Sequence, residues 1–192
     1  CFNGISSLEA ALSILRTGLM SIHERNTTGI PPFGASYGPD VRSGSGDNTL
    51  LRVIVPSGLN KDFGSHYAGG SYQALVHPKV VDRLDAYMYP SDEWGHCRPT
   101  SGCWINRKPV EVVIAATKQK YGVGNELVCR RGIAREYILR MTCDTETARQ
   151  ALLNAATAVG VEEVNGVPLT DFVVVTSSVR VAYERYIKPM GF

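Results

Sequence analysis

Residues 121–143 read YGVGNELVCRRGIAREYILRMTC, and this stretch decides the fold. A glycine-rich loop ends at Glu126, and the apolar run of residues 127–129 behind it predicts a buried strand. A second apolar run, residues 137–141, predicts the next strand. Glu126 is therefore an acid at the point where a loop meets a sheet, a common position for a residue that contacts substrate. The alternative is a solvated glutamate at a strand end.

The first eighteen residues predict a short strand and then a helix. Asn3-Gly4 interrupts an apolar start, and Ser6 and Glu9 have the spacing of a capping box. Gly18 supplies the positive φ that ends the helix. One face of the helix is apolar, at Leu8, Ala11, Leu12 and Leu15. A strand end, a polar turn and a helix N-terminus together suit an anionic ligand near Asn3, Gly4 and Ser6.

Further elements follow along the chain. Arg52 lies inside a β-branched run, so it must reach solvent or be paired. Asn165-Gly166 predicts a hairpin turn. The expected strands are residues 49–55, 71–78 and 171–176, and the expected helices are residues 78–87 and 145–160. Strands and segregated helices, without strict βαβ alternation, predict an α+β fold.

Composition narrows the class of protein. A chain of 192 residues that is 44% hydrophobic can bury the core of one domain or of two small ones, and we favour a single domain, residues 1–192. The net charge of +2 is too small to indicate nucleic-acid binding by itself. Because no apolar run reaches the length of a membrane helix, we expect a soluble protein and favour a cytoplasmic one.

The five cysteines do not predict a disulfide scaffold, because their number is odd and the chain is long. His96, Cys97 and Cys103 have no common zinc spacing and no obvious fourth ligand, so we expect no metal. A cysteine nucleophile in the same loop is also disfavoured, since adjacent loop residues rarely present a thiolate and a base to each other.

The two ends of the chain together resemble the ADP-ribosyltransferase superfamily, and the C-terminal half is most similar to the DarT-type enzymes that modify DNA bases. In that superfamily the first strand carries a polar residue and then a small one, here Asn3-Gly4, and a helix follows, here with residues 12–19 (LSILRTGL) at its end. In DarT-like members the catalytic Glu opens a strand that leads to an Ile-rich strand and a helix. Residues 126–129, residues 137–141 and the segment from Thr145 repeat that order.

The resemblance implies a single α+β domain with a split mixed and antiparallel β-sheet core and peripheral helices. It also implies that NAD is the co-substrate and that ADP-ribose is transferred to a nucleic-acid or protein acceptor with release of nicotinamide. Glu126 would be catalytic, with Arg52 either clamping the pyrophosphate or fixing Glu126. Asn3 and Gly4 would hold nicotinamide, and Tyr72 or Tyr67 would stack on it.

The loop of residues 118–125 occupies the place where the family binds its acceptor. Lys118, Lys120 and Tyr121 suit a nucleobase and its phosphate, although they also suit any exposed loop.

Two departures from the family pattern leave alternatives open. Asn3-Gly4-Ile5 stands where many members have His-Gly-Thr, which raises a non-catalytic binding module as an alternative. Gly124 stands where arginine-modifying members have Glu or Gln, so protein arginine is a less favoured acceptor. An RNA 2′-phosphotransferase on a related NAD-using fold is a further alternative, and its usual His and arginines are not evident.

Overall fold

The structure is a computed structural model of the chain, and it describes residues 1–30, 41, 46–52, 70–82, 86–89 and 126–192. The chain forms two compact units, and each is assembled from segments that lie far apart in the sequence. The first unit contains residues 1–19, 61–78 and 134–192, and the second contains residues 20–60 and 79–133. Each unit has its own β-sheet. That the whole chain is one domain stays a prediction.

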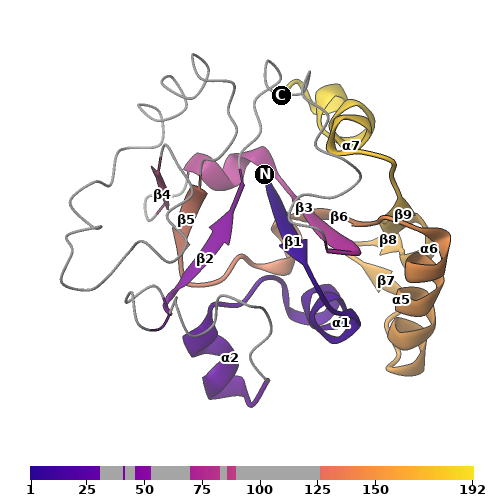
Figure 1. Ribbon diagram of the computed structural model, residues 1–192, viewed down its shortest axis with the longest axis horizontal. Helices are drawn as coiled ribbons and strands as arrows, with labels where there is room; N and C mark the ends of the chain where they lie inside the picture. Colours follow the sequence, from indigo (N-terminus) through magenta and orange to yellow (C-terminus); the bar gives the residue numbers. More distant parts are fainter. Residues whose placement is uncertain (31–40, 42–45, 53–69, 83–85, 90–125) are drawn as a thin grey trace. The chain divides into compact units, whose positions relative to one another are not determined.

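The first unit is built on a four-stranded mixed sheet with the order β1-β3-β6-β9 (Figure 1). Its strands are β1 (Phe2–Ile5), β3 (Tyr72–Val76), β6 (Ile138–Cys143) and β9 (Val173–Val175). The first three strands pair antiparallel, and β9 joins β6 in parallel. All five residues of β3 are buried, as expected for a strand with a neighbour on each side.

The helix α1 (Leu8–Thr17) begins one residue later than the sequence predicts. Its N-cap is Ser7, whose hydroxyl accepts a hydrogen bond from the amide of Ala10 over 3.2 Å. The capping box of Ser6 and Glu9 is therefore wrong, because Ser7 takes the cap and Ala10 then occupies the third helical position. Gly18 ends the helix with a φ of 81°, which confirms the expected positive φ.

Two further predictions for the first unit are confirmed. Helix α5 (Glu146–Ala158) begins at the N-cap Thr145 and is followed by Gly160 with a φ of 76°. Strands β7 (Glu163–Val164) and β8 (Val167–Pro168) form the expected hairpin, in which Asn165 and Gly166 have φ values of 55° and 75°. These are the two positive φ angles that a type I′ turn requires.

The end of the chain differs from its prediction. The short helix α6 (Leu169–Phe172) occupies the first two residues of the expected strand 171–176, so β9 begins only at Val173. Phe172 is almost completely buried. Its side chain therefore packs in the core, as expected, although the residue belongs to a helical turn and not to a strand. Helix α7 (Val179–Tyr186) then follows with Ser178 as its N-cap, and the 3-10 turn η6 (Lys188–Met190) ends the chain.

The second unit contains a three-stranded antiparallel sheet with the order β2-β5-β4 (Figure 1). Its strands are β2 (Asn48–Leu51), β4 (Ala86–Tyr89) and β5 (Glu126–Arg130). The expected helix over residues 78–87 is wrong in its second half. A 3-10 helix, η3 (Pro78–Asp82), comes first, and β4 then extends along β5. The sequence of β4, AYMY, is rich in aromatic residues, which favour a strand once a partner strand is present.

The helix α2 (Ile22–Thr28) lies in the second unit and has a capping box that the sequence prediction overlooked. The Ser21 hydroxyl accepts from the amide of Glu24 over 3.2 Å, and the Glu24 carboxylate accepts from the amide of Ser21 over 2.8 Å. Gly29 ends this helix in the left-handed conformation. Within the described part of the chain, none of the helices combines the length and the apolar character that a membrane span requires.

Candidate functional site

The candidate residues of the first unit lie on β1 and its neighbour β3. Val76 donates its amide to the carbonyl of Cys1 over 2.8 Å, and the Cys1 amine donates to the carbonyl of Val76 over 3.3 Å. Hydrogen-bonded and non-hydrogen-bonded pairs alternate along antiparallel strands. With the observed register, Asn3 and Ile5 bond to β3, and the N–H and C=O of Gly4 point away from it.

Gly4 therefore presents a free backbone edge. In the described sheet β1 pairs only with β3, and Gly4 itself is exposed. An outward N–H beside an outward C=O complements a carboxamide, which carries both an acceptor oxygen and donor hydrogens. Gly4 contributes this edge through its backbone alone, whereas Ser6, the other exposed candidate here, lies between β1 and the N-cap of α1.

A second glycine fixes where β1 and β3 meet. A Cβ on Gly70 would collide with the carbonyl oxygen of Ile5, and the carbonyl carbon would lie 2.9 Å away. Both obstacles are backbone atoms, so a side chain here would push the strands apart. Gly70 thus keeps β3 in register with β1 and positions the Gly4 edge.

The candidate Tyr72 lies on the opposite face of the sheet from Gln73, because successive side chains of a strand alternate. Tyr72 is 6% exposed and stands opposite Cys143. Burial first, and then the charges of Cys143, Asp144 and Glu9, raise the pKa of Tyr72. Glu9 belongs to the first turn of α1, so the Tyr72 side chain is packed near that helix. Its contact with nicotinamide stays a prediction.

A polar residue that the sequence analysis missed lies directly opposite Gly4. The register aligns Gly4, Gln73 and Thr142 across three strands, so these positions share one face of the sheet. The Gln73 side chain is fully buried at 0% exposure. Within the described part of the chain, neither its Oε1 nor its Nε2 has a hydrogen-bond partner. Burying an amide in this way costs about 1–3 kcal/mol, so the position calls for an explanation.

A signal for Gln73 was present in the sequence. It is the one polar side chain that interrupts the apolar residues of the run Tyr-Gln-Ala-Leu-Val. The Thr142 hydroxyl donates to the backbone carbonyl of Gln73 over 3.3 Å, which leaves the Gln73 amide itself unused. A lone amide in a central buried strand is unusual enough to mark a candidate site.

In the second unit, β2 and β5 bring two candidate positions together. Asn48 pairs with Arg130 and Leu51 pairs with Leu127. Leu51 and Leu127 are the last pair of this ladder. Arg52 directly follows β2 and Glu126 opens β5, so both residues lie at the same end of the ladder, each next to its last pair.

The position of Glu126 is central in its sheet. Strand β5 lies between β2 and β4, and Tyr89 of β4 pairs with Glu126 on the side away from Arg52. Arg52 is 8% exposed, so its guanidinium is largely withdrawn from solvent. A guanidinium presents several donors in a planar fork, which suits carboxylates and phosphates.

The remaining candidates fall outside this description. Neither the side chain of Glu126 nor any part of Lys118, Lys120 and Tyr121 lies within the described residues. The same holds for Tyr67, His96, Cys97 and Cys103. Among the residues that the structure does describe, no group of three or more His, Cys, Asp or Glu side chains could hold a metal ion.

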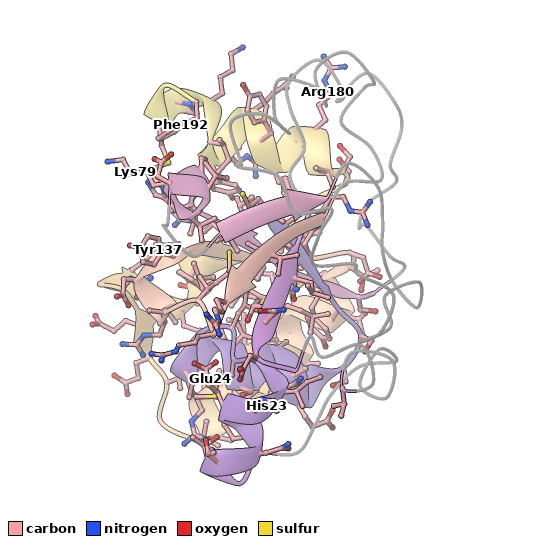
Figure 2. All side chains as sticks on the ribbon, turned by 90° about the vertical axis from the view of Figure 1, so that its left-hand side faces the viewer. His23, Glu24, Lys79, Tyr137, Arg180 and Phe192 are labelled. Carbon is pink, nitrogen blue, oxygen red and sulfur yellow. The ribbon has the colours of Figure 1, made fainter. Side chains whose placement is uncertain are left out.

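The start of β2 is linked to α2 through His23, which is labelled in Figure 2. His23 Nδ1 lies 2.7 Å from Asp47 Oδ1, and the amide of His23 donates to the carbonyl of Gly46 over 3.0 Å. A Cβ on Gly46 would lie 2.6 Å from the His23 ring. Gly46 thus allows the loop to approach His23, and this approach secures the strand that leads to Arg52.

Comparisons with known proteins give a match in structure alone. No protein-family model matches the chain, and no curated protein does. The structure of Thermosipho africanus DarTG in complex with ADP-ribose matches with a TM-score of 0.57 and 12% identity, over 91% of this chain and 48% of that one. The structure of Thermus sp. 2.9 DarT in complex with NAD+ has a TM-score of 0.49 and 11% identity, over 91% of this chain and 93% of that one.

The match to DarTG shows the fold. This chain spans about half the length of the DarTG chain and covers nearly all of its own length in doing so. The predicted α+β fold, with mixed and antiparallel sheets, is therefore confirmed, and it is similar to the fold of DarTG.

Proposed function

We propose that the chain is an NAD-dependent mono-ADP-ribosyltransferase that transfers ADP-ribose to a nucleic-acid or protein acceptor and releases nicotinamide. The observation that carries the proposal is that Arg52 and Glu126 lie at the same end of the β2–β5 ladder, each next to its last pair, in a chain whose fold matches that of DarTG. The DarTG structure contains ADP-ribose, the group that this reaction would transfer from NAD, and this supports NAD as the co-substrate here.

The reaction needs a fixed negative charge beside the ribose. Cleavage of the bond between nicotinamide and ribose develops positive charge on the ribose, and Glu126 is the acid assigned to stabilise it. Its carboxylate would accept a hydrogen bond from the ribose 2′-hydroxyl. In a base-modifying enzyme the same carboxylate would take the proton from the attacking group of the acceptor.

Arg52 is assigned to the anionic part of the dinucleotide or to Glu126 itself. Both roles use its charge in a setting withdrawn from water, where ionic hydrogen bonds are stronger. The position of Arg52 at the same end of the ladder as Glu126 supports the second role, because a guanidinium close to a carboxylate can orient it through hydrogen bonds.

Asn3, Gly4 and Ser6 are assigned to the nicotinamide end. The fit of this segment is supported by the outward N–H and C=O of Gly4, which match the donor and acceptor of the nicotinamide carboxamide. Asn3 retains a side chain that can donate and accept, although it lacks the imidazole of the family's common histidine. Lys118, Lys120 and Tyr121 remain the candidates for acceptor binding.

The test is incubation of the purified chain with labelled NAD and a panel of DNA, RNA and protein acceptors. We expect label on one class of acceptor, equimolar release of nicotinamide, and loss of both in Glu126→Ala. Glu136→Ala is the matched control, because Glu136 is an exposed acid in the 3-10 helix η5 (Arg135–Tyr137) and has no assigned role.

Three other results of this experiment would lead to different conclusions about the function. NAD binding without nicotinamide release would identify a non-catalytic binding module and contradict the enzymatic proposal. Removal of a 2′-phosphate from phosphorylated RNA would identify a phosphotransferase. Full activity in Glu126→Ala would remove Glu126 from the mechanism.

A further inference from the structure

We propose that Gln73 binds the carboxamide of nicotinamide and makes the site specific for NAD over its carboxylate analogue. The assignment rests on the proposed function and adds to it a residue that neither the sequence pattern nor the family resemblance indicated. The observation behind it is a fully buried primary amide with no hydrogen-bond partner on either polar atom within the described residues.

The position of Gln73 relative to Gly4 gives the ligand a route to it. Gly4 and Gln73 form a non-hydrogen-bonded cross-strand pair, in which the two Cα atoms lie about 4.5 Å apart and the side chains share a face. Gly4 has no side chain and is exposed, whereas its partner is covered. Because the two positions share a face, a ligand group above Gly4 on that face would lie beside the amide of Gln73.

The chemistry of the amide selects the ligand group. A primary amide offers one acceptor oxygen and a donor nitrogen, so a second primary amide satisfies both with two hydrogen bonds. A carboxylate has no donor for Oε1 and would leave that atom unpartnered, which is the origin of large discrimination in buried polar sites. Gln73 thus predicts preference for a neutral carboxamide and rejection of a nicotinic acid group.

Thr176 provides a matched control within the same unit. Its hydroxyl is also buried and, in the described part, has no hydrogen-bond partner. It follows β9, the strand at the opposite edge of the sheet from β1. Replacing Thr176 by Val and Gln73 by Met removes a buried polar group at each place with little change in shape.

The experiment is calorimetric titration of wild type, Gln73→Met and Thr176→Val with NAD and with nicotinic acid adenine dinucleotide. We expect wild type to prefer NAD by at least tenfold. Loss of two hydrogen bonds in Gln73→Met weakens NAD binding about 10- to 100-fold and leaves the carboxylate analogue almost unaffected, so the preference collapses. Thr176→Val keeps the wild-type preference.

The outcomes separate this assignment from the proposed function. If wild type binds NAD and Gln73→Met keeps the same preference, Gln73 has no role in recognition and a buried water accounts for its amide. If wild type binds neither dinucleotide, the proposed function fails and the assignment fails with it. Should Gln73→Met not fold, thermal unfolding of wild type decides, since nicotinamide must stabilise it and nicotinic acid must not.

Discussion

The two sheets differ in the kind of polar group that they place among apolar neighbours. The β1-β3-β6-β9 sheet carries neutral groups, namely the backbone edge of Gly4 and the buried amide of Gln73. The β2-β5-β4 sheet has charged residues at one end, where Arg52 and Glu126 each lie next to the last pair of the β2–β5 ladder. Neutral hydrogen-bonding groups recognise a neutral ligand, and charged groups stabilise charge that develops during a reaction.

This difference leads us to expect a division of roles. Substitutions in the first sheet will mainly change the affinity for NAD, because their partners are present in the ground state. Substitutions at the charged end of the second sheet will mainly change turnover, because positive charge on the ribose develops only in the transition state.

Arg52→Ala is expected to lower kcat/KM for NAD about 100- to 1,000-fold, the cost of removing one preorganised charged donor. Arg52→Lys should recover part of the loss, since it keeps the charge but not the planar fork. Steady-state nicotinamide release measures both variants. Arg130→Ala, which removes an exposed arginine from the same sheet, serves as the control. A normal kcat/KM in Arg52→Ala would contradict the expected division of roles between the two sheets.

Gly4→Pro is expected to weaken NAD binding about 3- to 10-fold with kcat almost unchanged. Proline removes the outward N–H of Gly4, and an edge strand tolerates it there because that N–H is not part of the sheet. Calorimetry gives the affinity, and a melting temperature without NAD shows whether the fold is retained. Unchanged affinity in a folded variant would mean that NAD does not use this edge.

Ser7→Ala is expected to lower the free energy of unfolding by about 1 kcal/mol, the usual contribution of an N-cap. Ser6→Ala should change it by less than about 0.5 kcal/mol, as exposed substitutions generally do. Urea titration compares the two. A larger loss of stability in Ser6→Ala than in Ser7→Ala would contradict this assignment and support the capping box of Ser6 and Glu9.

Alkaline pH is expected to lower the free energy of unfolding. Burial, reinforced by Asp144, raises the pKa of the Cys143 thiol from 9.0 to about 12. Above pH 9 the unfolded thiol loses its proton while the folded one keeps it, so stability falls as pH rises toward 12. Tyr72 acts in the same direction above pH 10, because its pKa is also raised. Cys143→Ala should show a shallower fall in urea titrations at pH 8 and 10.5, and an equal fall would contradict the assignment.

The sequence predicted best those elements whose signals are local. Gly18, Gly160 and the Asn165-Gly166 turn were identified because positive φ angles restrict the residue type directly. The strand that opens at Glu126 was identified because an apolar run follows a glycine-rich loop. Pairing between distant segments decides other cases, as at β4, where a partner strand overrides the expected helix.

Register explains why the site was only partly predictable. The pairing of Gly4 with Gln73, and the shared ladder end of Arg52 and Glu126, bring together residues about seventy positions apart. Sequence patterns suggested Arg52, Glu126 and Gly4 singly, but they did not indicate which neighbours these residues have. Gln73 was missed because its significance depends on burial without a partner, which only the packed strand reveals.

The most direct test is a single-turnover measurement of nicotinamide release from saturating NAD by Glu126→Gln, with the dissociation constant of NAD measured on the same sample. We expect a nearly normal dissociation constant for NAD. The rate of nicotinamide release should be at least 100-fold below that of wild type, because the substitution removes the charge of Glu126 and keeps its shape. Release at the wild-type rate would contradict this expectation.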